Sequence, residues 1–246
     1  MNAKAILSAC LDFFFEPRCF ACGEIVIRNS STCGAARCFC PICADALIPL
    51  NTPKCSVCAE PFLSAAQDHL CSTCLSHPPP FERVVATFEY GGPLAQAILR
   101  YKYAPAPFMA PELGRLMRVS TLGNVDWVLP VPLHRKRLAE RGFNQATLMA
   151  KEVCRQTGGQ LATHLLRRTG HQGAQVGKTK KERIKNMKRA FRVVDPRGLL
   201  AGKRVVLVDD VVTTTATARA ATRELIRQGR ASSVVVLCLG RAAAVS

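Results

Sequence analysis

Two adjacent aspartates, Asp209 and Asp210, end an apolar run that begins at Val205. Neighbouring carboxylates repel each other, so they need a cation or hydrogen-bond donors such as a pair of ribose hydroxyls. A helical pattern begins at Ala218, and its N-terminus and the N–H groups of the turn before it suit a phosphate. The turn is rich in hydroxyls: Thr213, Thr214, Thr215, Ala216 and Thr217. The segment predicts a binding site for a sugar phosphate.

The turn alone has a simpler interpretation. A buried parallel strand, a Thr-rich turn and a helix occur together in many α/β proteins, and Thr213 could be only a helix N-cap. The two carboxylates favour the binding site, because a strand that only fills the core gains nothing from adjacent charges at its end.

Four Cys-x-x-Cys pairs lie between residues 19 and 74. A two-residue gap lets both thiolates reach one metal ion, and two pairs complete the tetrahedral sulfur shell of a structural Zn²⁺ site. The intervals of 17 residues after Cys22 and 12 after Cys58 suit a ribbon closed by a hairpin. Pairing in sequence order predicts two zinc sites. The first comprises Cys19, Cys22, Cys40 and Cys43, and the second Cys55, Cys58, Cys71 and Cys74.

Other uses of these cysteines are redox chemistry, an iron–sulfur cluster or interleaved pairing of the four motifs. Cys33 and Cys38 are additional thiols, and Cys38 could compete with Cys40 as a ligand. His69 and His77 lie close by in the sequence, but with four thiolates available for each site they are expected at the surface.

The composition limits the class of protein. The chain has 246 residues, is 48% hydrophobic and carries a formal charge of +17, which favours a packed core and polyanionic partners. A generally Arg-rich proteome would also raise the charge. No apolar run approaches the ~20 residues of a membrane span. Only three residues separate Lys4 from Ser8, too few for the apolar core of a signal peptide, so a cytoplasmic protein is expected.

The elements that must position these residues follow an α/β pattern. Strands are expected over 81–90, 125–132, 205–210 and 233–239, and helices over 94–103, 110–119 and 218–228, the last followed by Gly229. The fold class is therefore α/β, with a parallel sheet flanked by helices. We expect a short N-terminal helix within 1–18, a cysteine-rich region over 19–77, and the α/β domain over 78–246, after the stiff His-Pro-Pro-Pro step.

Two segments gather positive charge. Residues 133–141 follow the strand over 125–132, at the edge of a parallel sheet where anions bind. Residues 172–192 carry eight cationic side chains and one acid, Glu182. A solvated basic helix face would explain the first segment on composition alone.

The segment 205–217 resembles the phosphoribosyl pyrophosphate (PRPP) motif of type I phosphoribosyltransferases. The resemblance implies that Asp209 and Asp210 bind the ribose hydroxyls of PRPP, which enters with Mg²⁺, and that residues 213–217 bind its 5′-phosphate. The family usually has Gly where this chain has Thr215. Gly permits positive φ and close backbone approach, so the exchange predicts a less favourable phosphate loop.

The run Arg-Gly-Phe-Asn-Gln at 141–145 closely resembles the signature of the ComF family of bacterial phosphoribosyltransferase-like proteins. Members often begin with a double zinc ribbon like residues 19–74. They also share a Pro-Pro-Phe segment, seen here at 79–81, and a segment like Leu-Arg-Tyr-Lys-Tyr, seen here at 99–103. The resemblance implies that residues 133–141 border the pyrophosphate site, that Lys102 lies near it, and that 172–192 form a hood over it. The implied pyrophosphate and hood residues are Arg135, Arg137, Arg141, Gln175 and Arg183.

The resemblance implies a protein that binds PRPP, possible transfer of phosphoribosyl to an unknown acceptor, and a role in natural competence, the uptake of DNA. No residue identifies the catalytic nucleophile. Two alternatives remain open: a protein that binds single-stranded DNA, alongside other competence proteins, and a scaffold that senses PRPP. Four aromatic residues among basic ones could stack on bases: Tyr101, Tyr103, Phe108 and Trp127.

We predict that the purified protein carries about two zinc ions per chain, because so small a cysteine-rich region has little core of its own and depends on metal for stability. Elemental analysis of protein never exposed to chelator checks this. Iron in place of zinc, or no metal, would contradict the assignment.

Overall fold

The computed structural model describes residues 16–27, 32–51, 53–62, 66–104, 106–169 and 190–243. Its centre is a five-stranded sheet in which every paired neighbour is parallel, as the sequence predicts. The strand order is β1-β7-β6-β2-β3. The strands are β1 (Arg83–Glu89), β2 (Trp127–Pro130), β3 (Gln160–Leu161), β6 (Arg204–Val212) and β7 (Ser233–Arg241).

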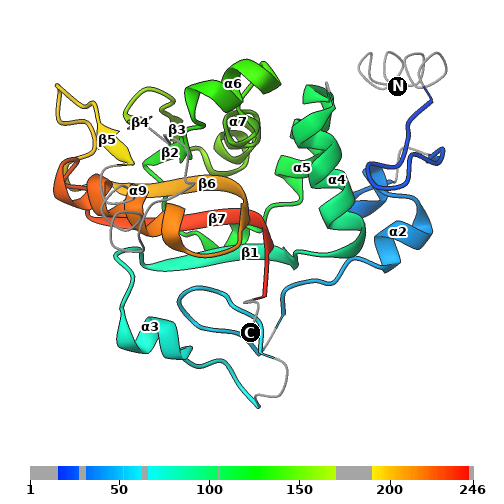
Figure 1. The fold of residues 1–246 in the computed structure, drawn as a ribbon, viewed down its shortest axis with the longest axis horizontal. Coiled ribbons are helices and arrows are strands. Elements are labelled where there is room, and N and C mark those ends of the chain that lie inside the picture. Colours follow the sequence, from blue (N-terminus) through cyan, green and yellow to red (C-terminus); the bar gives the residue numbers. More distant parts are fainter. Residues whose placement is uncertain are drawn as a thin grey trace, which may run out of the picture.

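Helices cover both faces of this sheet (Figure 1). They are α4 (Gly92–Tyr103), α5 (Ala110–Arg115), α7 (Gln145–Thr157) and α9 (Ala216–Arg227), with short 3₁₀ turns at Pro107–Met109 and Val119–Thr121. A further helix, α6 (Arg135–Arg141), follows β2 and has no buried residue. Alternation along β7 divides the core: Val235 and Leu237 pack with α4, α5 and α7, whereas Val234 and Val236 pack with α9.

The two cysteine clusters lie on opposite faces of the sheet. The first, with the 3₁₀ turn Gly34–Arg37 and α2 (Pro41–Asp45), joins the core of α4, α5 and α7. The second, with α3 (Ser72–Ser76), joins the core of α9. Figure 1 shows α2 beside α4 and α3 well apart from it, beyond β1. The cysteine-rich region is therefore two small units, each packed on a different side of the α/β fold.

The structure differs from the sequence prediction around the second strand. Residues 133–157 contain α6 and α7. Neither helix is among those expected from the sequence, because the positive charge of this segment was considered and not its helical periodicity. Gly142, with φ of 74°, ends α6, and the Asn144 side chain accepts a hydrogen bond from the Ala146 N–H at 3.1 Å to begin α7. Part of the Arg-Gly-Phe-Asn-Gln run is thus a helix stop followed by a helix start.

Other boundaries also moved. The expected helix over 110–119 ends at Arg115 and is followed by one 3₁₀ turn at Val119–Thr121, and the helix after the acid pair begins at Ala216 instead of Ala218. The left-handed residue after α9 is Arg230, with φ of 54°, and not Gly229. Gly229 instead packs closely, since an added Cβ would lie 2.7 Å from the Leu225 carbonyl oxygen.

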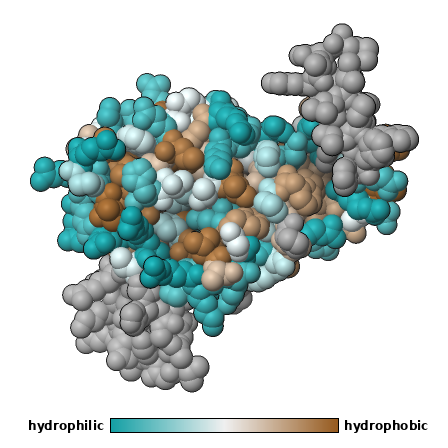
Figure 2. Space-filling view, turned by 90° about the horizontal axis from the view of Figure 1, so that it is seen from above, coloured by the Kyte–Doolittle hydropathy of each residue, from teal (hydrophilic) through white to brown (hydrophobic). Residues whose placement is uncertain are grey.

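A two-stranded antiparallel sheet, β4 (Leu166–Arg168) and β5 (Phe191–Val193), precedes and follows the segment 170–189. The expected hood therefore lies mostly outside the described residues, as does the expected N-terminal helix. Within the described ranges, no helix combines the length and apolar character needed to cross a bilayer. The face that carries α6 is mainly hydrophilic, with apolar patches between (Figure 2).

Candidate functional site

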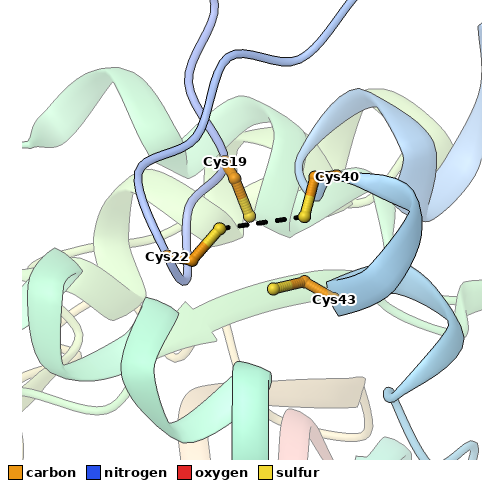
Figure 3. A group of neighbouring side chains, drawn as sticks. All are labelled: Cys19, Cys22, Cys40 and Cys43. Carbon is orange, nitrogen blue, oxygen red and sulfur yellow. Dashed lines mark hydrogen bonds between the residues drawn. The ribbon is translucent and has the colours of Figure 1, made fainter.

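The first cysteine cluster has the geometry of a metal centre. The sulfur atoms of Cys19, Cys22, Cys40 and Cys43 lie within 4.8 Å of one another and point to a common centre (Figure 3). Zn–S bonds of about 2.3 Å in a tetrahedron place sulfur atoms about 3.8 Å apart. The Cys22 and Cys40 sulfurs are 3.7 Å apart. These residues fit a tetrahedral zinc site.

The second cluster has the same form and is more deeply buried. Its four sulfurs also lie within 4.8 Å of one another, and the Cys58 and Cys71 sulfurs are 3.7 Å apart. The backbone N–H groups of Cys58 and Cys71 donate to the Cys55 sulfur at 3.5 and 3.4 Å. Although burial raises the pKa of Cys55, these N–H donors lower it to about 7, which favours the metal-binding thiolate.

Pairing in sequence order is confirmed, and the competing ligands lie elsewhere. Cys38 is buried outside the first cluster, Cys33 is exposed, and neither belongs to either group of four among the described residues. His69 is exposed and stacks on the Phe62 ring at 4.1 Å, while His77 is exposed beside Ser76. The histidines are surface residues, as expected.

A pocket opens at the carboxyl ends of β2 and β6, with a cavity volume of about 220 Å³. It brings together side chains from four separate parts of the chain, because parallel strands end at one edge of the sheet. Of the residues expected in the site, it is lined by Asp209, Asp210, Thr213, Thr217, Arg137 and Arg141. Gln175 and Arg183 lie outside the described residues.

Among the residues that line the pocket, Asp209 has the largest pKa shift. Lys102, on α4, lines the pocket and forms an ion pair with Asp210 at 2.9 Å. Asp209 accepts a hydrogen bond from the Asp210 N–H at 2.9 Å. Burial and the neighbouring Asp210 carboxylate together raise the pKa of Asp209 to about 7, against the opposing effects of the Asp210 N–H, Lys102 and Arg168. The described protein groups around Asp209 therefore do not fully balance its charge.

Arginines face the acids across the pocket. Arg137 and Arg141, from α6, line it together with Arg168, from β4, which the sequence analysis did not single out. Burial lowers the pKa of Arg168, and the nearby Arg137 guanidinium lowers it further. Arg141 lies over the Tyr103 ring, 5.1 Å from its centroid, and donates to the Gln145 side chain at 3.2 Å. Cations gathered this closely suit a multiply charged anion.

The loop 213–217 leads into α9 without backbone strain. Thr215 has φ of −71° and ψ of 7°, so this position does not need the left-handed conformation that favours Gly. The part of the prediction that rested on positive φ at position 215 is therefore wrong. Its hydroxyl accepts a hydrogen bond from Arg219 Nε at 2.8 Å. Thr214, Thr215 and Ala216 do not line the pocket described above.

A second hollow of about 730 Å³ adjoins the pocket and shares Pro132, Leu133, Asn144 and Arg168 with it. Arg135 lines this groove and not the acid pocket, which separates it from the other expected pyrophosphate residues. Four arginines line the groove: Arg135, Arg167, Arg168 and Arg192. Apolar side chains, among them Leu138 and Phe143, also line the groove.

Other pocket residues escaped the sequence analysis. Gln145 is 1% exposed, and its Nε2 has no hydrogen-bond partner among the described residues. The spacing of Ala146, Met149, Ala150 and Val153 is that of an apolar helix face and could have revealed α7. Arg168 offered no such signal, because its strand is three residues long.

Comparison with known proteins agrees with this arrangement. Residues 10–75 match the double zinc ribbon domain family, and residues 138–244 match the phosphoribosyl transferase domain family. The DNA utilization protein YhgH of Escherichia coli K12 is 34% identical over 82% of this chain and 89% of its own. Competence protein F of Haemophilus influenzae is 29% identical over 93% of this chain and 99% of its own. Competence protein ComFC of Bacillus subtilis is 36% identical over 44% of this chain and 41% of its own.

The cysteine clusters fit structural zinc, and the acid pair, arginines and loop occupy the edge of the parallel sheet expected of a phosphoribosyltransferase fold. Together with these matches over most of its length, they show that the chain belongs to the ComF family, which joins a double zinc ribbon to a phosphoribosyltransferase-like domain.

Proposed function

We propose that the pocket binds PRPP together with Mg²⁺ and supports transfer of the phosphoribosyl group to an acceptor in competence or DNA use. The observation that carries this proposal is the meeting of Asp209 and Asp210 with three arginines and the loop before α9 in one pocket. The names of the relatives support the biological setting. We place the protein in the cytoplasm, where PRPP is made.

In this mechanism the bond between the anomeric carbon and pyrophosphate breaks, and an acceptor nucleophile forms a new bond to that carbon. Asp209 and Asp210 accept hydrogen bonds from the ribose hydroxyls, and the N-terminus of α9 holds the 5′-phosphate. Arg137, Arg141 and Arg168 stabilise the charge that grows on the departing pyrophosphate. Mg²⁺, when bound with PRPP, supplies a further positive charge to the phosphate oxygens.

PRPP with Mg²⁺ should raise the melting temperature by about 5–10 °C at a hundredfold excess over its Kd, because a ligand that binds only the folded state stabilises it. In the double variant Asp209→Asn, Asp210→Asn that rise should disappear. The double variant should still fold, since Asn keeps the shape of both side chains, and its circular dichroism spectrum provides the control. An unchanged wild-type melting temperature at millimolar PRPP would contradict the proposal.

The raised pKa of Asp209 predicts a pH dependence. Since the ionised carboxylate is the form that accepts hydrogen bonds from ribose, PRPP affinity should rise about tenfold between pH 6 and pH 8 and level off above. The carboxyl carbon of Asp209 in the empty protein should titrate near pH 7 by ¹³C NMR, which separates this effect from titration of the ligand's phosphates.

Two comparisons sharpen the pH experiment. Asp210→Asn should move the Asp209 midpoint to lower pH, because it removes the neighbouring negative charge. Asp126 is the internal control: the Arg204 N–H and Lys203 lower its pKa, so it should titrate below its ordinary range. An Asp209 midpoint below pH 5 would contradict the electrostatic description of the pocket.

A second candidate function, binding of single-stranded DNA, is favoured by the groove beside the pocket. Its four arginines supply sites for phosphates, and Phe143 supplies an aromatic surface at its wall. Of the four aromatics expected to stack on bases, Tyr101 is excluded because it is fully buried and donates to the Gln145 carbonyl. Tyr103 is 75% exposed, beside Arg141.

If the groove binds single-stranded DNA through its four arginines, the logarithm of affinity should fall with the logarithm of salt concentration with a slope of about −3. The double variant Arg167→Gln, Arg192→Gln should weaken that slope by about 1–2. The charge-matched variant Arg223→Gln, Arg230→Gln, whose residues do not line the groove, should change it little. Fluorescence anisotropy with an oligonucleotide measures both, and equal slopes for the two variants would exclude this groove.

A further inference from the structure

Two arginines connect the second cysteine cluster to the phosphate loop. Arg219, in the first turn of α9, donates from Nε to the Thr215 hydroxyl at 2.8 Å. Its other end donates from Nη1 to the His77 carbonyl at 2.7 Å, and Nη2 lies 4.0 Å from the Cys74 sulfur. One side chain thus contacts both a residue of the loop and a thiol ligand of the metal site.

Arg241 makes the same connection from the last position of β7. Its Nε donates to the Cys58 carbonyl at 2.9 Å, and Nη2 lies 3.8 Å from the Cys58 sulfur. On the other side, Nη1 donates to the Thr213 carbonyl at 2.6 Å. The side chain is 2% exposed, so it holds its position among these partners without competition from water.

The charges at this junction depend on the metal. Four thiolates around one Zn²⁺ carry a net charge of about −2, and the Arg219 and Arg241 guanidinium groups lie beside two of the sulfurs. Arg241 also forms an ion pair with Glu60 at 3.5 Å. With the metal present, both arginines are drawn to the sulfurs, and their remaining N–H groups are aimed at the loop. Zinc holds the four sulfurs around one centre, so without it the Cys74 and Cys58 sulfurs no longer fix the positions of the two guanidinium groups.

The Thr215 side chain gives this connection a specific form. The resemblance to phosphoribosyltransferases has Gly at this position, which has no hydroxyl to offer. Thr215 makes no capping hydrogen bond of its own to α9. Its hydroxyl instead serves as the acceptor for Arg219, so the departure from the family pattern is also the contact that joins the loop to the cysteine cluster.

We propose that Arg219 and Arg241 are positioning residues through which zinc in the Cys55–Cys74 site and phosphate in the loop 213–217 stabilise each other's binding. The inference rests on the proposed function, because it concerns how well the loop holds the 5′-phosphate of PRPP. Coupling of this kind is reciprocal: zinc raises PRPP affinity, and PRPP raises zinc retention by the same factor. Loss or oxidation of this zinc site would then weaken the pocket from a distance.

The test uses the full-length protein loaded with zinc, and isothermal titration with PRPP and Mg²⁺. Arg219→Gln should lower PRPP affinity about tenfold, within the range seen for residues that support metal ligands. Arg223→Gln is the matched control, since it removes the same charge from the exposed next turn of α9 and should leave affinity within about twofold. Arg219 is chosen over the fully buried Arg241 because its replacement is less disruptive to folding.

A second variant, Thr215→Val, keeps the shape of the side chain and removes only the hydroxyl. It should lower affinity as Arg219→Gln does, and the double variant should lose no more than Arg219→Gln alone, because both remove one interaction. Additive losses would show that the two residues act independently and would overturn the proposal.

Zinc release is a second measurement, and PRPP would not affect it differently in Arg219→Gln if Arg219 had a purely structural role. With a chromogenic chelator in excess, saturating PRPP should slow release of one of the two zinc ions about tenfold in the wild type, and should not slow it in Arg219→Gln. Equal slowing of both ions would indicate only general stabilisation by the ligand and would contradict the coupling.

The outcomes separate the two proposals. If the wild type binds PRPP, and Arg219→Gln changes neither affinity nor the effect of PRPP on zinc release, the coupling is wrong and the proposed function stands. If the wild type does not bind PRPP, both proposals fail.

Discussion

Repulsion between two carboxylates at the end of a buried strand is the constraint on which the rest of the site depends. Asp209 and Asp210 are consecutive residues near the carboxyl end of β6 and line one pocket, so their charge must be compensated from elsewhere. Lys102 compensates Asp210 at 2.9 Å, and its helix, α4, must therefore pack so that its last turn reaches the sheet edge. Asp209 keeps a raised pKa, because burial and the Asp210 carboxylate oppose its ionisation.

The cysteine clusters support this pocket from two sides. On one face, Arg100 of α4 donates to the Cys19 carbonyl at 3.1 Å, two residues before Lys102. On the other face, Arg219 and Arg241 join the second cluster to the loop before α9. Each zinc unit is too small to fold on its own core, and each gains stability from the face of the sheet against which it packs. The metal sites are therefore part of the architecture that shapes the pocket.

The sequence predicts those parts of the protein whose signal is local. The four Cys-x-x-Cys pairs, taken in sequence order, predict the two clusters, and the apolar run before Asp209 identifies the central strand. The sequence cannot predict that the two clusters lie on opposite faces, because that depends on packing between distant segments. Arg168 was missed for the same reason: a strand of three residues carries no periodicity, and only the tertiary fold brings it to Arg137.

Thr215 shows why the type of a residue alone does not predict its backbone conformation. A β-branched residue in place of Gly restricts the backbone, but the observed φ of −71° is one that Thr adopts readily. The relevant property is the hydroxyl, which Arg219 uses as an acceptor. A residue that departs from a family pattern can thus be explained by a neighbour that the motif does not contain. Here that neighbour also contacts Cys74, so the explanation of one loop residue requires the cysteine cluster on the same face of the sheet.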